Sequence, residues 1–136
     1  MTESPVVGLA GSRTDLASAG ERFAHALAAT DRAGLLATLA PDLEFRGLTP
    51  RRAWSSESAE EVVDDIVFGT WFAEPKVIQG LESVATDRVA QRGSVTYRLL
   101  IDNDGEPNVC EQHAYYEVSD GRISWLRILC SGILPR

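Results

Sequence analysis

The hydrophobic period of this 136-residue chain changes near Pro75, and this change limits the fold more than any other feature of the sequence. Before Pro75 the apolar side chains recur at helical spacing, as Val63, Ile66 and Val67 do. After Pro75 apolar and polar residues alternate, which is typical of strands with one buried face. Helices followed by a run of consecutive strands predict a single α+β domain.

The first half of the chain predicts three helices. Residues 18–21 and 58–61 both read Ser-x-x-Glu, the form of a capping box, and we expect them to begin the first and third helices. The first helix is expected to reach Ala29. Asp31 is then placed to cap a short second helix, which ends at Pro41 because proline cannot continue a helix.

The second half predicts an antiparallel sheet of sequential strands. A brief strand over residues 43–45 comes first, before the third helix, and the chain is expected to turn over residues 46–50. Residues 103–105 and 119–121 each end in glycine and predict hairpin turns. The long strands are expected at residues 77–90, 94–101, 109–118 and 122–131.

Composition and charge exclude several classes of function. A net charge of −7 disfavours binding to nucleic acid, and no apolar run approaches the ~20 residues of a membrane span. Residues 1–17 lack the features of a signal peptide, so we expect a flexible leader and a cytoplasmic domain over residues 18–136. Cys110 and Cys130 are expected to be reduced thiols. No His or Cys spacing predicts a metal site, and no motif predicts a cofactor.

Two groups of residues carry a resemblance to a known family. The first comprises residues 23–31 and 39–45, and the second residues 114–123. In this element order they resemble the nuclear transport factor 2-like superfamily, whose branches include ketosteroid isomerases and SnoaL-like polyketide cyclases. The resemblance implies a cone-shaped α+β barrel. Three N-terminal helices would pack on a curved antiparallel sheet and leave a pocket for a hydrophobic small molecule.

The last hairpin decides which residues face that pocket. A three-residue loop over 119–121 would pair Val118 with Arg122, so that even-numbered residues of both strands share one side of the sheet. On that side Gln112 would face Ile128. A two-residue turn in the same loop would slip the register by one residue and mix the two sides. In proteins that the chain resembles, the first side lines the pocket and the other side forms a dimer contact.

The candidate site residues follow from this register and from the resemblance. Tyr116 and Gln112 are candidate catalytic residues because they point inward, where they either bind a ligand oxygen or satisfy each other in a core. Asp31 matches a catalytic aspartate of dehydratases with this fold, although an N-cap is the simpler interpretation. The expected ligand-binding residues are Phe23, Trp54, Tyr97, Ala114, Leu126, Ile128 and Cys130. The expected dimer contact consists of Glu111, His113, Tyr115, Trp125 and Arg127.

The catalytic groups of the known branches are incomplete in this sequence. The donor and base positions of ketosteroid isomerases correspond to Phe23, Gly47 and Ala114, which carry neither an acid nor a hydroxyl. No histidine stands where a dehydratase would need a partner for Asp31. An epoxide hydrolase-like set would use Arg98, whose flanking acids are missing in the sequence.

Three functions stay open. The first is a cyclase-, isomerase- or dehydratase-like enzyme for a hydrophobic, polyketide-like substrate, which would use Tyr116, Gln112 and Tyr97 in place of an acid–base pair. The second is a ligand-binding module without turnover. The third is a homodimeric or other protein-interaction domain that uses the face containing Trp125 and Arg127.

Overall fold

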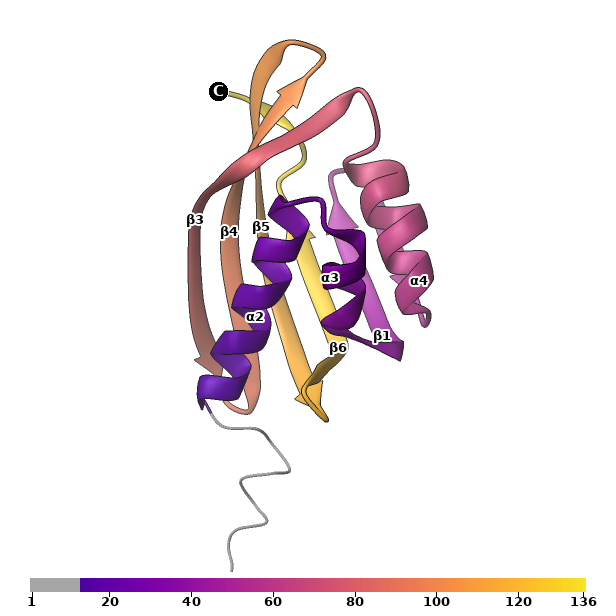
Figure 1. Cartoon of the computed structure of the whole chain (residues 1–136), viewed down its shortest axis with the longest axis vertical. Coiled ribbons are helices and arrows are strands. Elements are labelled where there is room, and N and C mark those ends of the chain that lie inside the picture. The colour runs from indigo at the N-terminus through magenta and orange to yellow at the C-terminus, as the bar shows by residue number, and fades with distance from the viewer. Residues whose placement is uncertain (1–12) are drawn as a thin grey trace, which may run out of the picture.

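Three helical segments occupy the first half of the described chain, as predicted. The computed structural model describes residues 13–136, and most of the predicted leader falls on residues 1–12, which lie outside the described residues. The first helix begins at Arg13 rather than at Ser18, so the end of the predicted leader is helical. The helices are α2 (Arg13–Ala28), α3 (Arg32–Ala37), α4 (Ala59–Glu61) and the π-helix η1 (Val62–Trp71), which continues α4 (Figure 1).

Side-chain caps begin α3 and α4 where the sequence predicts them. The Asp31 carboxylate accepts a hydrogen bond from the Gly34 N–H at 2.9 Å. The Ser58 hydroxyl accepts from the Glu61 N–H at 3.2 Å. The Glu61 carboxylate, instead of closing the capping box on Ser58, accepts from the Ser56 hydroxyl.

Within residues 13–136, seven strands form one mixed sheet. Their order is β2-β1-β6-β5-β4-β3, and β7 pairs with β5 outside this path. The four long strands lie where the alternating pattern predicts them, and each pairs antiparallel with its neighbour in sequence. The strands are β1 (Leu39–Thr49), β2 (Arg52–Ser56), β3 (Lys76–Val89), β4 (Arg92–Asn103), β5 (Glu106–Ser119), β6 (Arg122–Cys130) and β7 (Leu134–Pro135).

The prediction of a purely antiparallel sheet is wrong, because β1 pairs with β6 in parallel. The predicted brief strand over residues 43–45 continues to Thr49, past the glycine that suggested a turn. Gly47 stays extended because it has a neighbour on both sides, Trp54 of β2 and Ile128 of β6. The real turn comes at Pro50 and Arg51, where Arg51 has a φ of 71°.

The predicted register of the last hairpin is also wrong. Ser119 pairs with Arg122, so the loop has two residues, both with positive φ. A β-bulge at Ser124 then adds one residue to β6 and restores the alternation of the two sides. As a result Ile123 is fully buried, contrary to prediction. Residues from Leu126 onward keep their predicted side of the sheet, but each pairs with the β5 residue two positions beyond the predicted partner. Gln112 therefore faces Cys130 and not Ile128.

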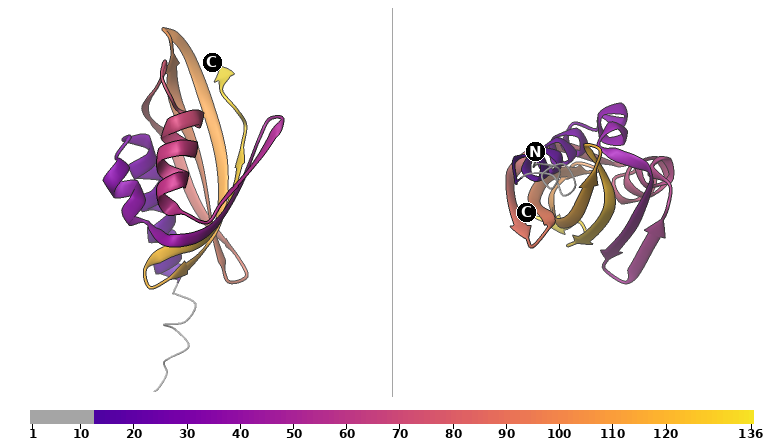
Figure 2. Two further views of the ribbon diagram at one scale, coloured as in Figure 1. Left: turned by 90° about the vertical axis from the view of Figure 1, so that its right-hand side faces the viewer. Right: turned by 90° about the horizontal axis from the view of Figure 1, so that it is seen from below.

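The helices lie on the same face of the sheet, and their apolar sides form one core with it (Figure 2). Tyr116 joins the two layers. It is fully buried, and its hydroxyl donates to the Leu16 carbonyl at 2.6 Å. Burial raises the pKa of Tyr116 to about 12, so the group stays a neutral donor. Its ring fits against Gly93, where a Cβ would lie 2.5 Å from a ring carbon.

Gly93→Ala is therefore expected to destabilise the fold by about 2 kcal/mol, because the new methyl group overpacks the Tyr116 site. Gly80→Ala is the matched control, since Gly80 is also a strand glycine and a methyl group added there would have no atom within 4 Å. Urea denaturation of both variants tests the packing. Equal free energies of unfolding for the two variants would show that the Tyr116 contact does not stabilise the sheet as described.

Candidate functional site

A row of buried polar side chains crosses the middle of the sheet beneath the helices. Tyr97 of β4 pairs with Gln112 of β5, which pairs with Cys130 of β6. Tyr97 and Gln112 are each 1% exposed, and the Tyr97 hydroxyl donates to the Gln112 side-chain oxygen at 2.5 Å. Burial raises the pKa of Tyr97 well above its usual range, so this hydroxyl stays protonated. The row thus contains neutral donors and one thiol on a rigid sheet.

Two buried side-chain nitrogen atoms lack a hydrogen-bond partner among the described residues. They are the side-chain amide nitrogen of Gln112 and the indole nitrogen of Trp71. Leaving a buried donor unpaired costs about 1–3 kcal/mol, so native proteins rarely retain one without a reason. Both groups can donate to an oxygen atom of a bound molecule.

Trp71 reaches the interior from the end of η1. Its ring lies over Gly47, where a Cβ would be 3.1 Å from two ring carbons. Phe45 and Trp54 flank it, each with its ring centroid 6.1 Å away. Trp54 is itself half-buried and donates from its indole nitrogen to the Thr49 hydroxyl at 2.9 Å. In the sequence Trp71 is recognisable only as part of an apolar helix face, because no sequence pattern reveals an unpaired indole.

Cys110 and Cys130 meet at one end of the polar row, with their sulfur atoms 3.6 Å apart. The Gly132 N–H donates to the Cys130 sulfur at 3.3 Å. Hydrogen bonding from Cys110 lowers the pKa of the Cys130 thiol, with smaller contributions from the nearby Gln112 amide, the Gly132 N–H and the charge of Lys76. The Gln112 amide nitrogen contributes by its proximity, since it makes no hydrogen bond with the sulfur. The hydrogen bond to Cys130 and burial together raise the pKa of Cys110. The pair therefore behaves as one ionisable thiol and one protonated partner.

We expect one native thiol to ionise at lower pH than the thiols of the unfolded chain, because only the folded state gathers donors around Cys130. In a pH titration followed by thiolate absorbance, the native protein should show this step first, and urea should move it to higher pH. Cys130→Ser should remove the step. A native titration that coincides with the unfolded one would contradict the arrangement of donors.

The other predicted catalytic residues lie elsewhere. Tyr116 is committed to the Leu16 carbonyl, and Asp31 is exposed at the start of α3, where it acts as the cap. Asp31 does not join the buried row, since that row lies on β4, β5 and β6. The remaining predicted ligand-binding residues, apart from half-buried Trp54, are buried members of the core: Phe23, Ala114, Leu126 and Ile128.

The predicted dimer residues lie together on the outer face of the sheet, away from the helices. Trp125 is held between two guanidinium groups, with Arg92 4.0 Å and Arg127 4.2 Å from its ring centroid. Arg127 also pairs with Glu44 at 2.5 Å. His113 stacks on Tyr115 with the ring centroids 4.5 Å apart.

Arg98 does have acidic neighbours, which the sequence did not reveal. It pairs with Glu82 of β3 at 2.6 Å and with Glu111 of β5 at 2.8 Å. These carboxylates are about half exposed on the outer face, so they are not an acid set inside a pocket. They form ion pairs with Arg98 between neighbouring strands on the solvent side of the sheet, as surface charges commonly do.

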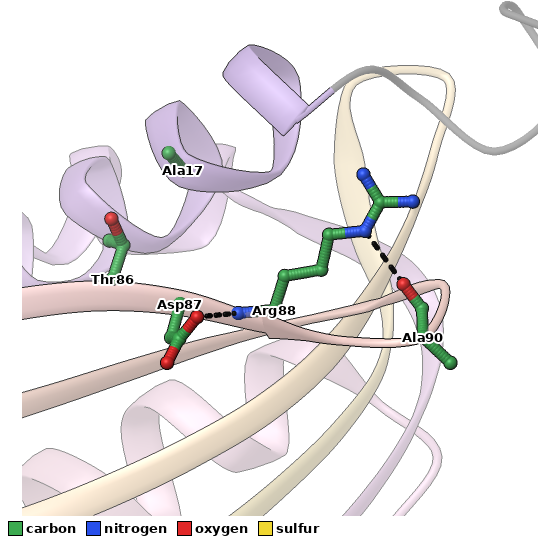
Figure 3. Close-up of a pocket in the computed structure, with 5 residues that line it drawn as sticks. All are labelled: Ala17, Thr86, Asp87, Arg88 and Ala90. Carbon is green, nitrogen blue, oxygen red and sulfur yellow. Dashed lines mark hydrogen bonds between the residues drawn. The ribbon is translucent and has the colours of Figure 1, made fainter.

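Neither of two surface hollows among the described residues is lined by Tyr97 or Gln112. The hollow in Figure 3, of about 600 Å³, lies between α2 and the end of β3. There the Arg88 guanidinium donates to the Ala90 carbonyl, and the Asp87 carboxylate accepts from the Arg88 N–H. One acid beside one base favours neither an anion nor a cation. A second hollow, of about 440 Å³, lies between α3 and the start of α4.

Metal and membrane features are missing from the described part of the chain. Within residues 13–136 no group of three or more His, Cys, Asp or Glu side chains is placed to hold a metal ion. None of the described helices is long and apolar enough to span a membrane.

Comparison with known proteins identifies the fold. No protein-family model matches the chain, and no curated protein matches its sequence. A nuclear transport factor 2-like protein from Burkholderia thailandensis is similar in structure, with a TM-score of 0.62 and 18% identity over 84% of this chain and 88% of that one. A proposed polyketide cyclase from Xanthomonas campestris pv. campestris has a TM-score of 0.67 and 16% identity over 86% and 90% of the two chains.

A third solved structure is an epoxide hydrolase of M. tuberculosis described as LEH-like, with a TM-score of 0.62 and 17% identity over 87% of this chain and 84% of that one. The chain therefore has the nuclear transport factor 2-like fold that the resemblance implied. At such low identities the likeness concerns the backbone, and the function has to be argued from the side chains.

Proposed function

We propose that this chain binds a hydrophobic, polyketide-like small molecule in its interior and holds an oxygen atom of that ligand against the Gln112 amide. The observation that carries the proposal is the buried Gln112 nitrogen, which has no partner among the described residues. A ligand carbonyl or hydroxyl oxygen would accept its hydrogen bond and remove the cost of the unpaired donor.

The surroundings of Gln112 support a site that recognises one oxygen atom. Tyr97 occupies the amide oxygen, which leaves the amide nitrogen for another acceptor. Phe23 packs on Tyr97 with ring centroids 6.3 Å apart, so the neighbouring surface is apolar. The indole of Trp71 offers a second donor from the opposite layer. Few polar groups in an apolar interior are typical of small-molecule sites.

An entrance is proposed at the end of the domain toward which η1 and β6 both run (Figure 1). Trp71, Phe72 and Cys130 lie at the ends of these elements and are each 7% exposed, more than the other buried apolar residues. Helices with π hydrogen bonding occur frequently at functional sites, and η1 has this form up to Trp71. Movement of the end of η1 would open the interior beside Gln112.

Cyclase- or isomerase-like turnover is a second candidate. A structural neighbour described as a proposed polyketide cyclase favours it, as does the lowered pKa of Cys130 next to Gln112. The buried polar residues among those described are otherwise neutral, and none is a carboxylate. Turnover would thus need proton transfer by the thiol, whereas binding needs only the donors. Binding without turnover is the simpler proposal.

Removing Tyr97 and Gln112 together separates ligand binding from folding. The double variant Tyr97→Phe/Gln112→Leu is expected to stay within about 1 kcal/mol of the wild-type stability, because both partners become apolar. Gln112→Leu alone should cost about 2 kcal/mol, since it leaves the Tyr97 hydroxyl buried without an acceptor.

Two probes of nearly equal shape, 2-acetylnaphthalene and 2-isopropenylnaphthalene, differ in that only the first has a ketone oxygen. The wild type should bind the ketone about tenfold more tightly by calorimetry, a difference of about 1.4 kcal/mol.

In the double variant this preference for the ketone should disappear while both probes still bind. Tyr116→Phe is the control, because it removes a buried hydroxyl outside the proposed site and should keep the preference. Equal affinity of the wild type for both probes, or no binding of either, would rule out a Gln112-centred site.

We also infer that the outer face supports a homodimer. Leu48 and Leu129 pair across β1 and β6 and are 53% and 57% exposed, which leaves two adjacent leucines in solvent. A largely apolar hollow of about 310 Å³ adjoins them and is bordered by Tyr115 and Arg127, two residues of the predicted contact. An apolar centre rimmed by aromatic and arginine side chains is typical of protein interfaces.

Leu129→Glu is expected to shift the protein from dimer to monomer in sedimentation velocity, because it places a charge at the centre of the proposed contact. Val89→Glu is the matched control. Val89 is 58% exposed but lies on the edge strand β3, which β5 and β4 separate from β6. A wild-type protein that sediments as a monomer, or a Leu129→Glu protein that stays dimeric, would refute this interface.

A further inference from the structure

The two cysteines of the sequence meet in space at the end of β6. Cys130 is the last residue of β6, and Cys110 lies on the neighbouring strand β5. Their sulfur atoms are 3.6 Å apart, in van der Waals contact without a bond. The β5–β6 register places Cys130 opposite Gln112, so the two cysteines are diagonal neighbours on the inward side. A disulfide holds its sulfur atoms about 2 Å apart, so closing the pair requires the sulfur atoms to approach and the end of β6 to adjust.

The two thiols differ in their surroundings. Cys130 receives the Gly132 N–H, and Gly132 has a φ of 81°, a conformation that glycine adopts without strain. Cys130 also keeps some contact with solvent at 7% exposure, whereas Cys110 is fully buried. Donors around a sulfur atom stabilise its thiolate, which is the reactive form toward oxidants. This asymmetry favours Cys130 as the attacking thiol and Cys110 as the resolving thiol.

We propose that Cys130 and Cys110 form a peroxide-reactive thiol pair that closes to an intramolecular disulfide. The Cys130 thiolate would attack hydrogen peroxide. A sulfur–oxygen bond would form, the oxygen–oxygen bond would break, and the hydroxide that leaves would take up a proton to become water. The Cys110 sulfur would then attack the Cys130 sulfenic acid, releasing the oxygen as a second water together with the Cys110 proton. The two sulfur atoms lose two electrons in total, and these reduce one peroxide.

Hydrogen peroxide suits this site because it is small and polar. Cys130 is only 7% exposed, so a small oxidant such as hydrogen peroxide would reach it with less displacement of its neighbours than a bulky disulfide such as oxidised glutathione. The Gly132 N–H that contacts the sulfur would also hold the first oxygen close to it. This proposal does not depend on a ligand in the interior, since both thiols belong to the protein.

Intact-mass spectrometry of the full chain tests the pair directly. Native protein treated with hydrogen peroxide should lose about 2 Da, and dithiothreitol should restore the mass. The reaction should be at least tenfold faster than in urea, because unfolding separates the thiols and removes the Gly132 donor. Cys110→Ser should instead gain about 16 Da on the peptide that contains Cys130, because a sulfenic acid without its resolving thiol accumulates. Peptide mapping separates this product from oxidation of Met1, the single methionine.

The wild-type comparison in buffer and in urea needs no variant, so it decides the proposal even if a cysteine variant fails to fold. Equal rates in the two conditions would overturn it, because the fold would then contribute nothing to the reaction. Two free thiols after peroxide treatment, or a disulfide between two chains on a non-reducing gel, would overturn it as well. Loss of about 2 Da within one chain at the higher native rate is the result expected.

Discussion

Parallel pairing between β1 and β6 places Gly47 beside Ile128 and makes room for the helix above them. Because Gly47 has no side chain, the ring of Trp71 can lie directly on the sheet. The end of η1 thereby comes close to the strands that carry Tyr97, Gln112 and Cys130. A Cβ at this position of β1 would lie 3.1 Å from two carbons of the Trp71 ring, so the ring would have to move outward.

Neutral polar groups inside a packed core set what the interior can do. Tyr116 shows the structural use of such a group, since its hydroxyl ties β5 to α2 and leaves no donor free. Gln112 is only partly used in this way. Tyr97 donates to its side-chain oxygen, but its amide nitrogen has no partner among the described residues and is left for a ligand. Apolar residues at both Gln112 and Tyr97 would leave no buried polar group unpaired, so folding alone does not require this pair. The retained amide is thus better explained by binding than by folding.

Local patterns predicted the elements of the fold better than their partners. Ser58 and Asp31 cap helices as expected, because capping depends on a few adjacent residues. The parallel partner of β1 was missed because pairing between distant strands leaves no local signal. The predicted register of the last hairpin is wrong because the two-residue turn reverses the sides of β6 and the bulge at Ser124 reverses them again. The sequence shows only the resulting alternation of apolar and polar residues, which is the same as for a three-residue turn without a bulge. For the same reason the inward side was right from Leu126 onward.

The site depends on such long-range neighbours even more than the sheet does. Alternation alone predicts that Tyr97, Gln112 and Cys130 point inward, but their hydrogen bonds and the contact with Cys110 require the observed register. Moving β6 by the two positions that separate prediction from structure would put Ile128 opposite Gln112. Cys130 would then face Cys110 directly and lose its place beside the amide. The two-residue turn and the bulge at Ser124 each move β6 by one position, so together they decide whether the thiol stands next to the unpaired donor, and the two proposals share this dependence.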